Sequence, residues 1–93
     1  MYLWFYFTDS LMTRNYITEE NRIYLPDDNW NILAEIDFEQ VDDKIYNISH
    51  TFVDDSLRGQ WIGSELVEKA MTYLISKWYN VTATCPYAKK QIN

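Results

Sequence analysis

Val53-Asp-Asp-Ser-Leu-Arg-Gly-Gln-Trp-Ile-Gly63 is the stretch that decides the fold. Residues before it alternate as in a β-strand, and apolar residues after it recur every three or four positions, as in an amphipathic helix. The glycine-containing turn therefore lies at a helix N-terminus, where unpaired N–H groups and the helix dipole can bind phosphate. By itself, the pattern is a weak signal, because an ordinary glycine-containing helix cap is the commoner explanation.

Three strands are predicted before this stretch, at residues 21–25, 30–40 and 44–53. Pro26-Asp-Asp-Asn29 and Val41-Asp-Asp-Lys44 separate them and have the composition of turns. Short turns between strands predict an antiparallel three-stranded meander. Alternation within the third strand predicts two faces, one with Tyr46, Ile48, His50 and Phe52, the other with Ile45, Asn47, Ser49, Thr51 and Val53.

After Gly63, one apolar stripe predicts a helix that ends near Asn80. The stripe consists of Leu66, Val67, Ala70, Met71, Leu74, Ile75 and Trp78. Val81-Thr-Ala-Thr-Cys85 then predicts a strand parallel to strand 44–53, joined by a right-handed crossover, and Tyr87 to Asn93 predicts a short final helix. The expected fold class is α+β.

Length and charge narrow the classes of function. Ninety-three residues fit one domain, expected over residues 12–93. A net charge of −6 opposes binding to nucleic acid or to anionic membranes, and favours a cationic partner or an amine substrate. One cysteine, Cys85, and one histidine, His50, leave no basis for a disulfide or a structural metal site, so we expect a cytoplasmic protein without metal.

The N-terminal run Met1-Tyr-Leu-Trp-Phe-Tyr-Phe7 is apolar and aromatic. It has no basic flank and is too short to span a bilayer, so neither a signal peptide nor a membrane span is predicted. We expect residues 1–11 to be an extension that packs on the surface or forms a homodimer contact.

The decisive stretch resembles the acyl-CoA signature of the GNAT superfamily of N-acetyltransferases, Arg/Gln-x-x-Gly-x-Gly/Ala. Arg58 opens the motif and Gly63 closes it. Ile48-Ser-His-Thr51 and Thr84-Cys-Pro-Tyr-Ala-Lys89 are similar to a compact single-domain subfamily, and the resemblance extends from about Ile17 to Lys90.

The resemblance implies acetyl-CoA as the acyl donor and a GNAT-like arrangement of the strands. It also implies that loop amides bind the diphosphate and that the main chain of the preceding strand pairs with pantetheine. The cofactor-binding residues expected on this basis are Thr51, Phe52, Val53, Arg58, Gly59, Gln60, Trp61, Ile62, Gly63 and Ser64.

Trp61 departs from the family motif, because it stands where the internal glycine is expected. With helical torsions and an outward indole, the amides would stay available and the indole could cover the adenine or the diphosphate. With a positive φ, the tryptophan would be strained.

Three ionisable residues are candidates for the catalytic step. His50 could deprotonate the incoming amine, since its pKa is near neutrality, or could be a histidine hydrogen-bonded within the sheet. Tyr87 matches a tyrosine acid of the family, or is a packing residue. Cys85 could carry the acyl group covalently, or could be a small buried apolar residue.

The function predicted from the sequence is transfer of an acetyl group from acetyl-CoA to a small-molecule or protein amine. Two alternatives stay open: a non-catalytic acyl-CoA-binding module, and a structural protein that binds partners through its aromatic N-terminus.

Overall fold

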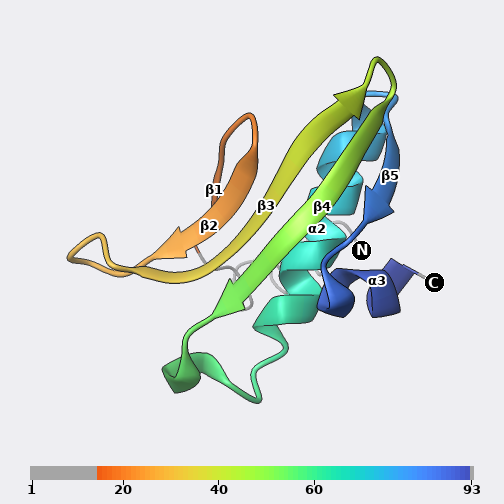
Figure 1. Ribbon diagram of the computed structural model, residues 1–93. Coiled ribbons are helices and arrows are strands. Elements are labelled where there is room, and N and C mark those ends of the chain that lie inside the picture. Colours follow the sequence, from red (N-terminus) through yellow and green to blue (C-terminus); the bar gives the residue numbers. More distant parts are fainter. Residues whose placement is uncertain (1–14, 93) are drawn as a thin grey trace, which may run out of the picture.

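The computed structural model describes residues 15–92, which form an α+β fold with one mixed sheet (Figure 1). The sheet has the strand order β1-β2-β3-β4-β5. Each of the first four strands pairs antiparallel with the next one along the chain. The last strand, β5, follows the crossover through α2 and pairs parallel to β4. The bounds are β1 Ile17–Thr18, β2 Arg22–Pro26, β3 Ile32–Asp42, β4 Ile45–Val53, α2 Ile62–Ser76, β5 Asn80–Ala83 and α3 Pro86–Ile92.

This architecture confirms the predicted meander, the parallel strand and the short C-terminal helix. Two details differ from the prediction. A two-residue strand, β1, pairs with β2 at the sheet edge. The helix α3 begins at Pro86, one residue before the predicted start at Tyr87. Proline suits this position, because the N–H that it lacks would have no acceptor in the first turn of a helix.

The predicted extension at residues 1–11 lies outside the described residues. Within residues 15–92, no helix is both long enough and apolar enough to cross a bilayer.

The hydrophobic core lies between one face of the sheet and α2. Each strand of the meander contributes alternate residues, as the period of two requires. The fully buried large side chains are Ile23, Ile36, Phe38, Ile48, Ile62, Leu66 and Leu74.

A β-bulge changes the faces of β4 halfway along the strand. Asp37 pairs with His50 and Phe38 pairs with Ile48, so Ser49 is an extra residue on β4. Tyr46 and Ile48 are buried, whereas His50 and Phe52 are exposed. The prediction that these four residues share one face is therefore wrong beyond Ile48, because simple alternation has no place for the extra residue.

The C-terminal end of α2 is a Schellman motif. Trp78 N–H donates to the Ile75 carbonyl at 2.9 Å, and Tyr79 N–H donates to the Leu74 carbonyl at 3.1 Å. Trp78 has φ +70°, the conformation in which this motif usually has glycine. The helix therefore ends at Ser76, earlier than the predicted Asn80, and Trp78 is exposed instead of joining the apolar stripe.

Candidate functional site: a fork between β4 and β5

Strands β4 and β5 pair over only four residues and then separate. Their last paired residues are Ile48 and Ala83, beyond which β4 continues to Val53 and pairs with β3 alone. The Ile48 carbonyl accepts hydrogen bonds from the amides of Thr84 and Cys85 at 3.0 and 3.2 Å. Figure 1 shows β4 running on past the point where β5 ends and α3 begins. The two strands therefore form a fork.

Asn47 connects the two strands just before the fork. Its amide nitrogen donates to Thr84 Oγ1 at 2.9 Å, and its amide oxygen accepts from Thr82 Oγ1 at 2.9 Å. Asn47 is the one buried polar side chain in the described part of the chain. Since both ends of its amide group are satisfied, Asn47 fixes the position at which β4 and β5 part.

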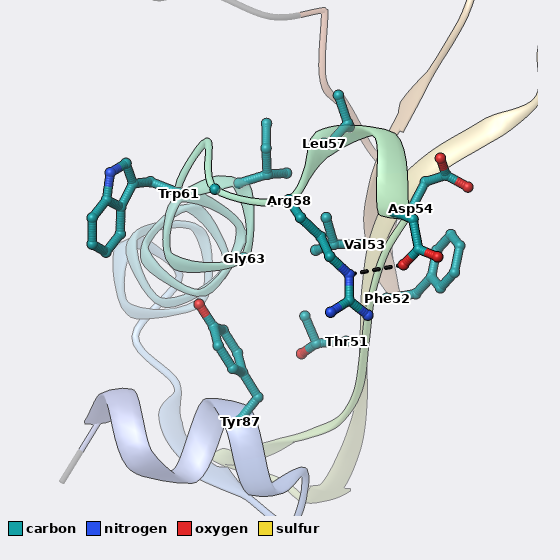
Figure 2. A pocket seen from close by; sticks show the side chains of 12 residues that line it. Thr51, Phe52, Val53, Asp54, Leu57, Arg58, Trp61, Gly63 and Tyr87 are labelled. Carbon is teal, nitrogen blue, oxygen red and sulfur yellow. Dashed lines mark hydrogen bonds and ion pairs between the residues drawn. The ribbon is translucent and has the colours of Figure 1, made fainter.

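A cavity of about 760 Å³ opens between the free part of β4, the loop after it and the start of α2 (Figure 2). A volume of this size suits a small-molecule ligand. Its lining consists of Thr51, Phe52, Val53, Asp54, Asp55, Leu57, Arg58, Gly59, Trp61, Ile62, Gly63 and Tyr87. The structure thus brings together eight of the ten predicted cofactor-binding residues; Gln60 and Ser64 do not line the cavity.

The N-terminus of α2 forms one wall of this cavity. Trp61 is the N-cap, and its side chain makes no capping hydrogen bond. The first intrahelical bond runs from the Glu65 amide to the Trp61 carbonyl at 3.0 Å. The amides of Ile62, Gly63 and Ser64 therefore have no acceptor within the helix, which is the arrangement that binds phosphate groups at helix N-termini.

Trp61 adopts a strained conformation, with φ +63° and ψ 20°. Its indole is 78% exposed and points away from Arg58 and Tyr87 (Figure 2). Of the two alternatives considered from the sequence, the positive φ is therefore the one present, and the helical torsions are not, although the indole does point outwards.

Trp61→Gly is expected to stabilise the fold. A left-handed backbone conformation destabilises a residue that has a side chain by about 1–2 kcal/mol, and glycine avoids this cost. Glycine also loses more conformational entropy on folding, which offsets about 0.5–1 kcal/mol of the improvement. We expect a net gain of about 0.5–1 kcal/mol, measured by urea denaturation. Trp61→Ala is the matched control, because it removes the indole but keeps the strain. Equal stability of the two variants would show that the torsion is not the cause.

Two acidic residues of the loop after β4, Asp54 and Asp55, line the cavity. The sequence shows that this loop is acidic, but the predicted site did not include these two residues. Arg58 Nε lies 2.8 Å from Asp55 Oδ1, and both side chains are largely exposed. Hydrogen bonds from the side chain and backbone N–H of Ser56 hold the pKa of Asp54 below its usual range. Asp54 therefore stays charged, and Arg58 is paired with a carboxylate through an exposed ion pair, which is weak enough for a phosphate group to displace.

Cys85 lies next to the fork, in contact with β4. Its Sγ is 3.4 Å from Thr51 Oγ1. Burial opposes ionisation of the thiol, but the Thr51 hydroxyl and the backbone amides of Ala88, Tyr87 and Thr51 outweigh it and hold the pKa of Cys85 below its usual value. Cys85 is thus a buried core residue whose polar neighbours lower the pKa of its thiol.

Thr51→Val is expected to raise the pKa of the Cys85 thiol, because valine keeps the volume but removes the hydroxyl that lies 3.4 Å from the sulfur and can bond to the thiolate. The pH dependence of thiolate ultraviolet absorbance measures this, with Cys85→Ser as the blank. The thiol has a lower pKa in the folded state than in the unfolded state, where the pKa is about 8.5. Ionisation of the thiol therefore stabilises the fold at pH values above about 8.5, and this stabilisation is lost as the pH falls through the folded-state pKa. The variant should therefore lose more stability relative to wild type at alkaline pH than at neutral pH; an unchanged titration would contradict the contribution of the Thr51 hydroxyl.

The other two candidate catalytic residues lie on different sides of the sheet. Tyr87, from the first turn of α3, lines the cavity, and its hydroxyl is 3.2 Å from Ser64 Oγ. His50 is exposed and pairs in register with Asp37, and it does not line the cavity. Thr51 thus lies near Cys85 within the fork, while the bulge places His50 on the face opposite the core.

No group of three or more His, Cys, Asp or Glu side chains within residues 15–92 is arranged to hold a metal ion.

Comparison with protein families gives a match over residues 22–93 to the family described as GCN5-related N-acetyl-transferase. A search of curated proteins finds no match. Among solved structures, a GCN5-like protein from Staphylococcus aureus, determined by NMR, is 35% identical with a TM-score of 0.70, over 84% of this chain and 76% of that chain.

Two more distant structures show the fold alone. A protein of Deinococcus radiodurans R1, assigned to the acetyltransferases, is 17% identical with a TM-score of 0.62, over 77% of this chain and 53% of that chain. Ribosomal-protein-alanine N-acetyltransferase from Brucella melitensis biovar Abortus 2308 is 14% identical with a TM-score of 0.59, over 77% of this chain and 56% of that chain. The chain therefore spans about half the length of these two proteins.

Proposed function

The chain belongs to the GCN5-related N-acetyltransferase family, and from that premise we propose that it transfers an acetyl group from acetyl-CoA to an amine. The observation that supports this most is the junction of two features: the free edge of β4 beyond Ile48 and the uncapped N-terminus of α2, which border one cavity.

The residues around the cavity suit the two ends of the donor. The amides of Ile62, Gly63 and Ser64 would bind the diphosphate, since they have no acceptor within α2. The main chain of β4 at Thr51 and Val53 would pair with the pantetheine arm, because β5 has left this part of the strand. Arg58 would exchange its bond with Asp55 for a phosphate contact.

Three side chains would handle protons and the acyl group. His50 lies outside the cavity on the opposite face of the sheet, so it would accept the proton that the amine loses on bonding to the acetyl carbonyl carbon only for an acceptor that approaches from that face. Tyr87 would donate its hydroxyl proton to the sulfur as the carbon–sulfur bond breaks. Cys85, with its depressed pKa, offers a covalent route in which the thiolate takes the acetyl group first and the amine then receives it.

The acceptor is proposed to be a small-molecule or protein amine, and a cationic acceptor suits the net charge of −6.

Two measurements test the proposal. Acetyl-CoA should raise Tm, since a ligand that binds only the folded state stabilises it. Candidate amines should then release free CoA. The absence of any rise in Tm at millimolar acetyl-CoA would overturn the proposed binding. An acetyl adduct on Cys85, found by mass spectrometry without acceptor, would identify the covalent route.

A second candidate function is a non-catalytic acyl-CoA-binding module. The carboxylates of Asp54 and Asp55 favour it, because their negative charge opposes the binding of an anionic ligand without removing the cavity. Binding of acetyl-CoA without CoA release from any amine would distinguish this module from the enzyme. The predicted homodimer through residues 1–11 stays a prediction, for which the mass in solution with and without these residues is the test.

A further inference from the structure

Gly63 lies directly against the ring of Tyr87. A Cβ atom at Gly63 would be 2.7 Å from the Tyr87 hydroxyl oxygen and 2.9 Å from each of the ring atoms Cε2 and Cζ. These separations are shorter than van der Waals contact, so any side chain at position 63 would collide with the phenol. Figure 2 shows the Tyr87 hydroxyl directed towards Gly63.

Backbone conformation does not explain the glycine at position 63. Gly59 has φ +82°, where a side chain would be strained, but Gly63 is a helical residue in the first turn of α2 without a positive φ. Alanine is better than glycine in a helix, so helix formation alone would favour alanine at this position. The close approach of Tyr87 therefore explains the glycine at position 63.

The phenol is held from both of its ends. At its base, α3 is anchored by Ala88, which is fully buried. At its tip, the hydroxyl lies 3.2 Å from Ser64 Oγ. The space left by the missing side chain of Gly63 sets how deeply the ring lies between these two anchors.

We infer that Gly63 is a positioning residue, which seats Tyr87 so that its hydroxyl faces the cavity beside the α2 amides. The inference rests on the proposed function, and it gives Gly63 a role separate from the approach of a phosphate group to the main chain. Gly63→Ala should act by displacing Tyr87, because the phenol is 40% exposed and can swing outwards. The start of α2 cannot shift in the same way, since Ile62 and Leu66 are buried.

A double-mutant cycle between Gly63→Ala and Tyr87→Ala tests this. In the otherwise wild-type protein, Gly63→Ala should lower kcat about 10-fold to 100-fold by misplacing the hydroxyl, while Kd for acetyl-CoA changes less than about threefold. In the Tyr87→Ala background, Gly63→Ala should leave kcat unchanged. It should also raise Tm by about 4 °C there, because alanine favours the helix once the ring is gone, but should not raise Tm when Tyr87 is present.

Two results would overturn the inference. One is an equal rise in Tm in both backgrounds, which would show that the two residues are not sterically coupled. The other is the same loss of acetyl-CoA affinity in both backgrounds, which would assign Gly63 to the phosphate. If the proposed function is wrong, the wild-type protein will not bind acetyl-CoA. In that case, the Tm measurements on the four proteins of the cycle still test whether Gly63 and Tyr87 are sterically coupled.

Discussion

Ser64→Glu is expected to weaken acetyl-CoA binding about 100-fold without lowering Tm. Position 64 is the third residue of α2, where a glutamate can reach back to the N-terminal amides and complement the helix dipole, a gain of about 0.3–1 kcal/mol. The same carboxylate would occupy the amides proposed for the diphosphate and repel its charge. At an effective dielectric of about 20 and a separation of about 6 Å, that repulsion is about 2.8 kcal/mol, or roughly 100-fold in affinity.

The matched control is Ser64→Gln, which has the shape of glutamate without its charge. We expect its Kd to lie within about fivefold of wild type, measured by calorimetry at fixed ionic strength. Raising the salt concentration should recover part of the affinity of the glutamate variant, because salt screens exposed charges. Equal affinity of the two variants would contradict the placement of the diphosphate at the start of α2.

Phe38→Ala is expected to lower the free energy of unfolding by about 3–5 kcal/mol. Phe38 is 2% exposed and belongs to the core between the sheet and α2. Its ring centroid is 6.1 Å from that of Tyr46, at an interplanar angle of 66°, and 6.0 Å from that of Tyr73. Removal of the ring deletes its buried apolar surface, leaves a cavity and loses both aromatic contacts.

Phe38→Leu is the control for this site, with an expected loss below about 1.5 kcal/mol because most of the apolar volume remains. Urea denaturation measures both variants, and an unchanged m-value would confirm that the same surface unfolds. A loss below about 1.5 kcal/mol for Phe38→Ala would contradict a single core shared by β3, β4 and α2.

The sequence predicts most of the fold, because its hydrophobic periods are clear in β3 and α2. Alternation identifies Ala34, Ile36 and Phe38 as a buried face. The helical stripe likewise identifies Leu66, Ala70 and Leu74. These patterns come from burial on one side of an element, which is the property that periodicity reports.

The differences arise where local geometry departs from a regular period. The extra residue at Ser49 reverses the faces of β4, and a bulge depends on pairing with β3, which a single strand does not reveal. Trp78 fits the helical period, yet α2 ends before it in a left-handed turn for which tryptophan gives no signal.

The candidate site was predictable where it follows from chain order and not where it depends on contacts in space. The turn at the start of α2 was visible as residues 58–63. The contact of Tyr87 with Gly63 joins residues that are 24 positions apart in the sequence, and the contact of Thr51 with Cys85 joins residues that are 34 positions apart. Such contacts require the fork between β4 and β5, which sequence periodicity does not locate.

The most direct test of the account is a titration of the 15N-labelled protein with acetyl-CoA, followed by amide NMR shifts. We expect the largest changes at the amides of Ile62, Gly63 and Ser64 and along β4 at Thr51 and Val53, with small changes at the β3–β4 turn near Asp43. Saturable binding that shifts other amides and leaves those of α2 and β4 unmoved would contradict it.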